Sequence, residues 1–161
     1  MKVRSDTITL DELDWSILQL LQSNANLTYT KMGRQLEVAH STIYERIKRM
    51  EEQGVIKKYT VAVDLERIGR KPVTAIMTVF ADPKEIEAVA KKLAGMKEAV
   101  EVDTSLSEEL LIIAKVVAED QEKLHDFIAQ KIVPLTGVLR IRTSIVTKKF
   151  KEGEFLIKGL K

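Results

Sequence analysis

Residues 28 to 56, TYTKMGRQLEVAHSTIYERIKRMEEQGVI, decide the fold of the first third of the chain. They predict two short helices joined by a tight turn, and the second helix has one apolar and one polar face. Ile43, Ile47 and Met50 recur at the helical repeat, and Val38 in the turn extends the same apolar cluster. This layout is typical of a helix-turn-helix, whose second helix contacts DNA.

The polar face of that second helix changes in character along its length. Hydrogen-bonding side chains occupy its N-terminal end, and cationic side chains follow. In a helix-turn-helix the first turns of the second helix meet base edges, while phosphates lie beside its later turns. The expected base contacts are His40, Ser41, Thr42, Tyr44 and Glu45. The expected phosphate contacts are Lys48 and Arg49, with Lys31 and Arg34 from the preceding helix.

The composition limits the class of protein. With 161 residues and 45% hydrophobic content, the chain can form one medium domain or two small ones. It has no run of 18 apolar residues and no cationic segment followed by an apolar one at its N-terminus, so we expect neither a membrane span nor a signal peptide. The absence of cysteine excludes disulfides and thiolate metal sites. We therefore expect a cytoplasmic protein that does not associate with membranes.

The distribution of charge is more informative than its sum. A net charge of +2 argues against indiscriminate binding of nucleic acid, which usually requires a strongly basic protein. Cations nevertheless gather between residues 46 and 58, at Arg46, Lys48, Arg49, Lys57 and Lys58. A locally cationic face on a nearly neutral domain leaves more of the affinity to correct docking, often by a dimer.

Capping residues and turn residues divide the chain. We expect a first helix over residues 11 to 23 with Asp11 as its N-cap, and Thr28 as the N-cap of the second helix. The period-two pattern over 57 to 64 predicts a hinge strand. Turn-forming residues that end at Pro72 then predict the domain boundary.

The remainder of the chain alternates between strand and helix patterns. Strands are predicted at 73–80, 100–106, 110–117 and 139–145, with one helix opened by Pro83 and another around 124–128. The order β-α-β-β-α-β is that of the ferredoxin-like split unit, so the fold class is α+β. Both helices are expected on one face of the sheet. Apolar residues on the other face predict that a second subunit covers it.

Residue types that would support catalysis are scarce. His40 and His125 lie in different predicted domains, so no histidine metal site or catalytic histidine pair is expected. The glycines match no phosphate-binding fingerprint. Glu108 and Glu109 are adjacent, and adjacent side chains of a strand point to opposite faces. We expect no enzyme activity, no metal and no cofactor. An alternative is a small-molecule-binding regulatory module whose helical domain docks a protein partner.

The combination of a helix-turn-helix, a hinge strand and a βαββαβ domain resembles the Lrp/AsnC family, the leucine-responsive or feast/famine transcription regulators. The residues that carry the resemblance are Leu10 and Asp11, LDWSIL at 13–18, NAN at 24–26, RIKRMEEQGVI at 46–56, and Pro134, Gly137, Val138 and Thr143. It implies homodimers built through the second domain, often assembled into larger oligomers, that bind palindromic double-stranded operators. It also implies an AsnC-type helix-turn-helix domain at 10–71, a ferredoxin-like oligomerisation and effector domain at 72–150, and a C-terminal tail at 151–161.

The chain departs from the family pattern in the turn before the second helix of the motif. Glu37 and Ala39 stand where the family usually has a glycine and an N-cap serine. Because alanine has no side chain that could cap the helix, we expect His40 or Ser41 to take that role.

A second departure lies between the second and third predicted strands. Family members that bind amino acids tend to have a glycine followed three residues later by an aspartate there, lining an effector site between dimers. This chain has Leu106, Ser107, Glu108 and Glu109. A side chain in place of the glycine obstructs close approach of a ligand to the backbone. We therefore expect no response to neutral amino acids; a basic amino acid, another small molecule and no effector at all remain alternatives.

Overall fold

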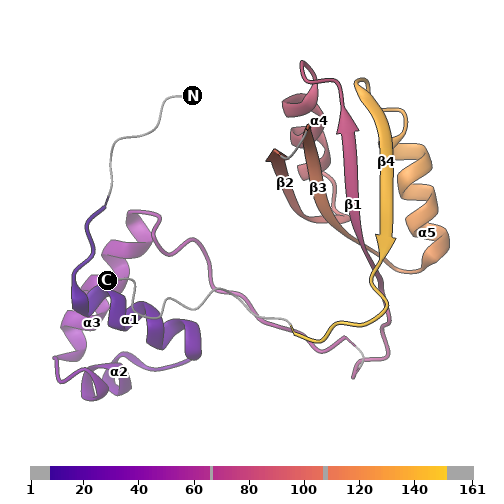
Figure 1. Cartoon of the computed structure of the whole chain (residues 1–161). Coiled ribbons are helices and arrows are strands. Elements are labelled where there is room, and N and C mark those ends of the chain that lie inside the picture. Colours follow the sequence, from indigo (N-terminus) through magenta and orange to yellow (C-terminus); the bar gives the residue numbers. More distant parts are fainter. Residues whose placement is uncertain (1–7, 66, 107–108, 152–161) are drawn as a thin grey trace. The chain divides into compact units, whose positions relative to one another are not determined.

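The computed structural model describes residues 8–65, 67–106 and 109–151. The chain forms two compact units, one ending at Ala62 and the other beginning at Val63 (Figure 1). Each unit is built around its own cluster of buried apolar side chains. No helix among these residues is long and apolar enough to cross a membrane.

The first unit contains three helices, α1 (Glu12–Ser23), α2 (Tyr29–Gln35) and α3 (His40–Glu52). Asp11 caps α1 by accepting a hydrogen bond from the N–H of Asp14, whose side chain accepts from the N–H of Asp11 in return. Thr28 caps α2 by accepting from the N–H of Lys31 at 3.3 Å. Both predicted N-caps are confirmed.

The core of the helical unit is small and fully enclosed. Ile43, Ile47 and Met50 of α3 are almost completely buried, as the sequence pattern predicted. They pack with Ile17 of α1 and Met32 of α2. One face of α3 is therefore fixed to the other two helices, and its opposite face is left to solvent.

The second unit is a four-stranded antiparallel sheet with helices, in the predicted order β-α-β-β-α-β. Its strands are β1 (Val73–Ala81), β2 (Ala99–Leu106), β3 (Leu110–Ala118) and β4 (Val138–Ile145), arranged in the sheet as β2-β3-β1-β4. Its helices are α4 (Ile86–Ala94) and α5 (Gln121–Asp126), and α5 continues directly into a π-helix, η1 (Phe127–Ile132). The ferredoxin-like architecture is confirmed.

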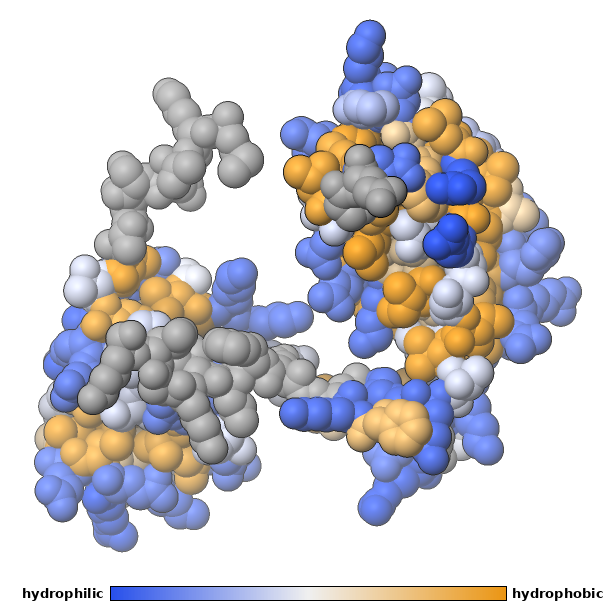
Figure 2. All heavy atoms as spheres, viewed as in Figure 1, coloured by the Kyte–Doolittle hydropathy of each residue, from blue (hydrophilic) through white to orange (hydrophobic). Residues whose placement is uncertain are grey.

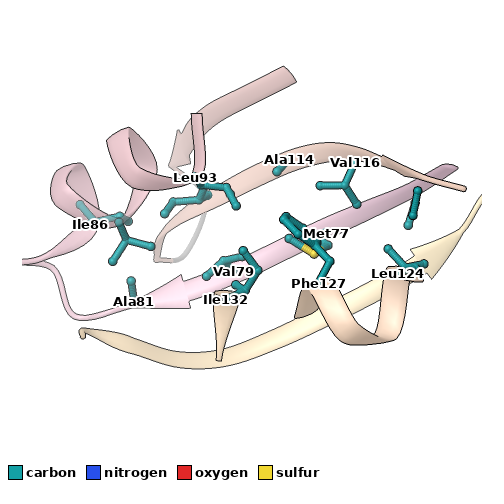
Figure 3. Close-up of a cluster of buried hydrophobic side chains, with 14 residues drawn as sticks. Met77, Val79, Ala81, Ile86, Leu93, Ala114, Val116, Leu124, Phe127 and Ile132 are labelled. Carbon is teal, nitrogen blue, oxygen red and sulfur yellow. The ribbon is translucent and has the colours of Figure 1, made fainter. Parts of the chain in front are cut away.

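The two faces of this sheet differ. Side chains from the helices, among them Ile86, Leu93 and Phe127, pack against alternate residues of the central strands, such as Met77 of β1 and Val116 of β3 (Figure 3). On the opposite face the alternation leaves Ile76 and Ile113 more than a third exposed. Figure 2 shows apolar residues gathered over the strands among polar ones.

Two predicted elements differ from those observed. The hinge strand expected over 57–64 is not formed: the described residues between Glu52 and Val73 contain no strand. A strand needs a hydrogen-bonded neighbour, and no described residue supplies one for this segment. The helix expected to begin at Pro83 begins at Ile86. Asp82 accepts hydrogen bonds from the N–H groups of Lys84 and Glu85, which hold a turn before the helix.

Candidate nucleic-acid interface

The turn between α2 and α3 is held by close backbone contacts. Gly33 of α2 is buried, and a Cβ atom at this position would lie 2.6 Å from the carbonyl oxygen of Val38. The N–H of Val38 donates to the carbonyl of Gly33 at 2.9 Å. Glu37 has a φ of 56°, in the left-handed region that favours glycine. The chain thus adopts the glycine conformation there with a glutamate.

The start of α3 corrects one prediction. The helix begins at His40 with Ala39 in the N-cap position, and no side chain caps it. His40 and Ser41 therefore do not act as caps, because both already lie within the first helical turn. The N–H groups of this turn have no side-chain acceptor from the cap position and face the end of the helix.

The outward face of α3 presents the predicted contact residues. His40, Ser41, Tyr44, Glu45, Lys48 and Arg49 are exposed, and Thr42 is half-buried. Lys31 and Arg34 on α2 are also exposed. Lys48 approaches Glu52 one turn later, with 3.9 Å between the ammonium nitrogen and a carboxylate oxygen. Both side chains are mostly exposed, so solvent screens this pair strongly.

One flank of α3 is joined to α1 by ion pairs. Asp14 is 1% exposed and accepts hydrogen bonds from Arg46 at 3.0 Å and from Arg49 at 2.6 Å. Arg46 also donates to Asp11 at 2.6 Å. The hydrogen bond from Arg46 lowers the pKa of the Asp11 carboxyl from 3.8 to about 2, and the pKa of Arg46 is raised in turn. The paired carboxylates of Asp11 and Asp14 thus stabilise the charged form of Arg46.

The other flank of α3 carries aromatic side chains. The rings of Tyr29 on α2 and Tyr44 on α3 lie 5.7 Å apart at 59°, a tilted geometry favourable for aromatic pairs. Further along, the hydroxyl of Tyr59 donates to Glu51 at 2.8 Å. Partial burial of Tyr59 is the main cause that raises its pKa to about 12, and the carboxylate of Glu51 is the second. Tyr44 is thus held in place from α2 while 47% exposed.

Sequence patterns did not single out three of these residues. Asp14 and Tyr29 were not candidates, and Arg46 was noted only for its charge. The sole indication in the sequence was an aspartate at a helix position otherwise occupied by core residues.

The two units agree with two family models that together match most of the chain. Residues 10–51 match the AsnC-type helix-turn-helix domain, and residues 74–155 match the Lrp/AsnC ligand binding domain. The chain belongs to the Lrp/AsnC family. This bears out the family resemblance of the sequence.

A curated relative of this Lrp/AsnC protein is a transcription regulator, and solved structures share its fold. It is 32% identical over 145 residues to the HTH-type transcriptional regulator Ptr1 of Methanocaldococcus jannaschii, covering 89% of this chain and 96% of that protein. The structure of E. coli AsnC matches with a TM-score of 0.81 at 23% identity, covering 92% of this chain and 99% of AsnC. The NMB0573/L-Met complex from Neisseria meningitidis has a TM-score of 0.78, also at 23% identity, covering 90% of this chain and 94% of that one.

This Lrp/AsnC protein is a DNA-binding transcription regulator with a helix-turn-helix domain and a ligand-binding domain. The family's members are regulators, in line with the expectation of a protein that is not an enzyme. Among the described residues, no group of histidine and acidic side chains is arranged to hold a metal ion.

The predicted effector loop is only partly described. Ser107 and Glu108 lie outside the described residues. Leu106 ends β2 with 78% of its surface exposed, and Glu109 approaches Arg140 of β4 at 3.7 Å. A separate hollow of about 390 Å³ lies at the other end of β2 and β3, where Lys131 donates to Glu98 at 2.7 Å. Leu106 and Glu109 do not line that hollow.

Proposed function

We propose that α3 binds in the major groove of a double-stranded operator. The observation that carries the proposal is the arrangement of α3, whose inner face is fully buried while its outer face presents hydrogen-bonding groups first and cations later. The proposed base contacts are His40, Ser41, Thr42, Tyr44 and Glu45. The proposed phosphate contacts are Lys48, Arg49, Lys31 and Arg34.

We further propose that the protein acts as a homodimer or larger homo-oligomer on an inverted repeat. Ile76 and Ile113 leave apolar surface on the open face of the sheet. Val61, Val63 and Leu65 are also exposed at every second position of a segment that pairs with no strand among the described residues. A second copy would cover both surfaces, and a two-fold dimer requires two matching half-sites. We place its action in the cytoplasm, in keeping with a DNA-binding regulator of this family.

Selection of bound fragments from a random duplex library tests the DNA proposal. We expect an enriched inverted repeat, a changed sequence preference for Glu45→Ala, and uniformly weaker binding for Lys48→Ala. A library without enrichment would refute the proposal and favour the alternative, in which the helical unit docks a protein partner.

Light scattering on the full-length protein tests the proposed interface. Ile113→Arg places a charge on the open sheet face and is expected to reduce the oligomer to monomers. Val133→Arg introduces the same charge at an exposed apolar position that follows η1, so this control should leave the oligomer intact. An Ile113→Arg variant that keeps the mass of the wild-type oligomer would place the interface elsewhere.

We also propose that the second domain responds to a small molecule, as its family model suggests. The bulky, exposed Leu106 and the acidic Glu109 favour a cationic ligand over a neutral amino acid. Calorimetric titration with each standard amino acid distinguishes the alternatives. Binding of lysine or arginine alone supports this interpretation of the loop, and tight binding of methionine or leucine contradicts it.

A further inference from the structure

The C-terminal half of α3 carries three cations, Arg46, Lys48 and Arg49, and two of them are already paired within the protein. Arg46 and Arg49 contact carboxylates of α1 at 3.0 Å or less, whereas the contact of Lys48 with Glu52 is long and solvent-screened. Lys48 is therefore the one residue of the three whose charge is not neutralised at short range.

Both oxygens of the two carboxylates at the start of α1 accept hydrogen bonds. One oxygen of the Asp14 carboxylate accepts from Arg46, and the other accepts from Arg49 and from the N–H of Asp11. Asp11 accepts from Arg46 and from the N–H of Asp14. We call Asp11, Asp14, Arg46 and Arg49 the α1–α3 ion-pair cluster.

We propose that the α1–α3 ion-pair cluster raises the selectivity of the protein for its operator by suppressing its binding to random DNA. The inference rests on the proposed function of α3. Non-specific affinity comes almost entirely from counterions released when cations neutralise phosphates. A phosphate that approaches Arg49 must compete with Asp14 and is also repelled by that carboxylate. Asp11 and Asp14 are thus positioning residues that act on DNA through the arginines.

Random and specific complexes should differ in their use of Arg49. In a random complex the groove and backbone are not aligned with α3, so Arg49 stays with Asp14. In the operator complex the base contacts fix the docking, and the half-exposed guanidinium can share one of its remaining N–H donors with a phosphate. Lys48 contacts phosphates in both complexes.

The test measures binding of the full-length protein to the selected operator and to a random duplex by fluorescence anisotropy over a series of salt concentrations. Each phosphate contact contributes about 0.9 to the slope of log affinity against log salt. Lys48→Gln should lower this slope by about 0.9 on both duplexes. Arg49→Gln should leave the random-duplex slope nearly unchanged and weaken operator binding, so the ratio of the two affinities falls.

Asp14→Asn tests the same proposal in the opposite direction. It releases Arg49, so the slope on random DNA should rise by up to about 0.9 and binding should tighten by up to about eightfold at 0.1 M salt. The matched control is Glu12→Gln, which removes the same charge from the same turn of α1. Glu12 is exposed and forms no ion pair with the described residues, so its substitution releases no arginine.

Circular dichroism verifies that each variant is folded. If Asp14→Asn does not fold, the Lys48 and Arg49 variants still decide the test, because both positions are exposed. An Arg49→Gln slope on random DNA as low as that of Lys48→Gln would overturn the inference. So would a folded Asp14→Asn variant with the slope of the Glu12→Gln control. By contrast, a wild-type protein that prefers no duplex would refute the proposed function itself.

Discussion

Substitution of Gly33 by alanine tests how the turn positions α3. Alanine is the better helix former by about 0.5 to 1 kcal/mol, so helix propensity alone predicts stabilisation. The new Cβ atom would, however, lie 2.6 Å from the carbonyl oxygen of Val38 and 3.3 Å from the nitrogen of His40. Both are backbone atoms of the segment that leads into α3, and neither can move aside without shifting that helix.

The clash should outweigh the gain in propensity. Forcing an extra carbon atom into a closely packed site costs about 1 to 3 kcal/mol. We therefore expect Gly33→Ala to lower the free energy of unfolding of the helical unit by about 1 kcal/mol or slightly more. For a unit of this size, that corresponds to a fall in melting temperature of about 4 to 8 °C.

Trp15 makes the measurement specific, because it is the chain's only tryptophan and packs against the core of the helical unit. Urea unfolding followed by its fluorescence reports on that unit alone. The control is Thr30→Ala, an exposed position on α2 that gains helix propensity without a clash, and it should be unchanged or slightly more stable. A Gly33→Ala protein as stable as this control would refute the close packing of the turn. Operator affinity should fall with Gly33→Ala as α3 shifts.

Three further predictions concern single groups. In an ultraviolet pH titration Tyr59 should ionise with a pKa of about 12, and Glu51→Gln should bring that pKa nearer to 10. Since the pKa of Tyr59 is raised in the folded state, Tyr59 should stabilise the fold fully below about pH 10, and this stabilisation should be lost between pH 10 and 12. The lowered pKa of Asp11 should stabilise the folded protein fully above about pH 4, and this stabilisation should be lost as the pH falls to about 2. Arg46→Gln should remove this step from the acid unfolding curve. Met77→Ala empties a fully buried site in the second unit and should reduce its free energy of unfolding by about 2 to 5 kcal/mol in thermal unfolding.

The predictions that succeeded depend on neighbours in sequence. The caps Asp11 and Thr28 act on N–H groups three residues away, so their role can be recognised from a short window. The buried side of α3 follows from the spacing of its apolar residues. The order of elements in the second unit was predictable for the same reason, because period-two strands and helical stripes are local patterns.

The predictions that failed depend on context outside such a window. The hinge strand has the right residue alternation, but pairing requires a second strand, and the described part of the chain places none beside it. Asp14 is 32 residues from Arg46 and 35 from Arg49, so no local pattern joins them. The expected cap at His40 or Ser41 failed because the helix already includes both residues, with Ala39 in the N-cap position.

The neighbours of α3 therefore hold several of its proposed contact residues in place. On one flank α1 holds Arg46 and Arg49, and on the other α2 holds Tyr44 through Tyr29. A substitution in α1 or α2 can change which groups reach DNA without altering any residue of α3. Operator preference in this protein should then respond to changes at Tyr29, whose ring orients Tyr44. Tyr29→Ala should broaden the base preference beside Tyr44, whereas Tyr29→Phe, which keeps the ring, should preserve it.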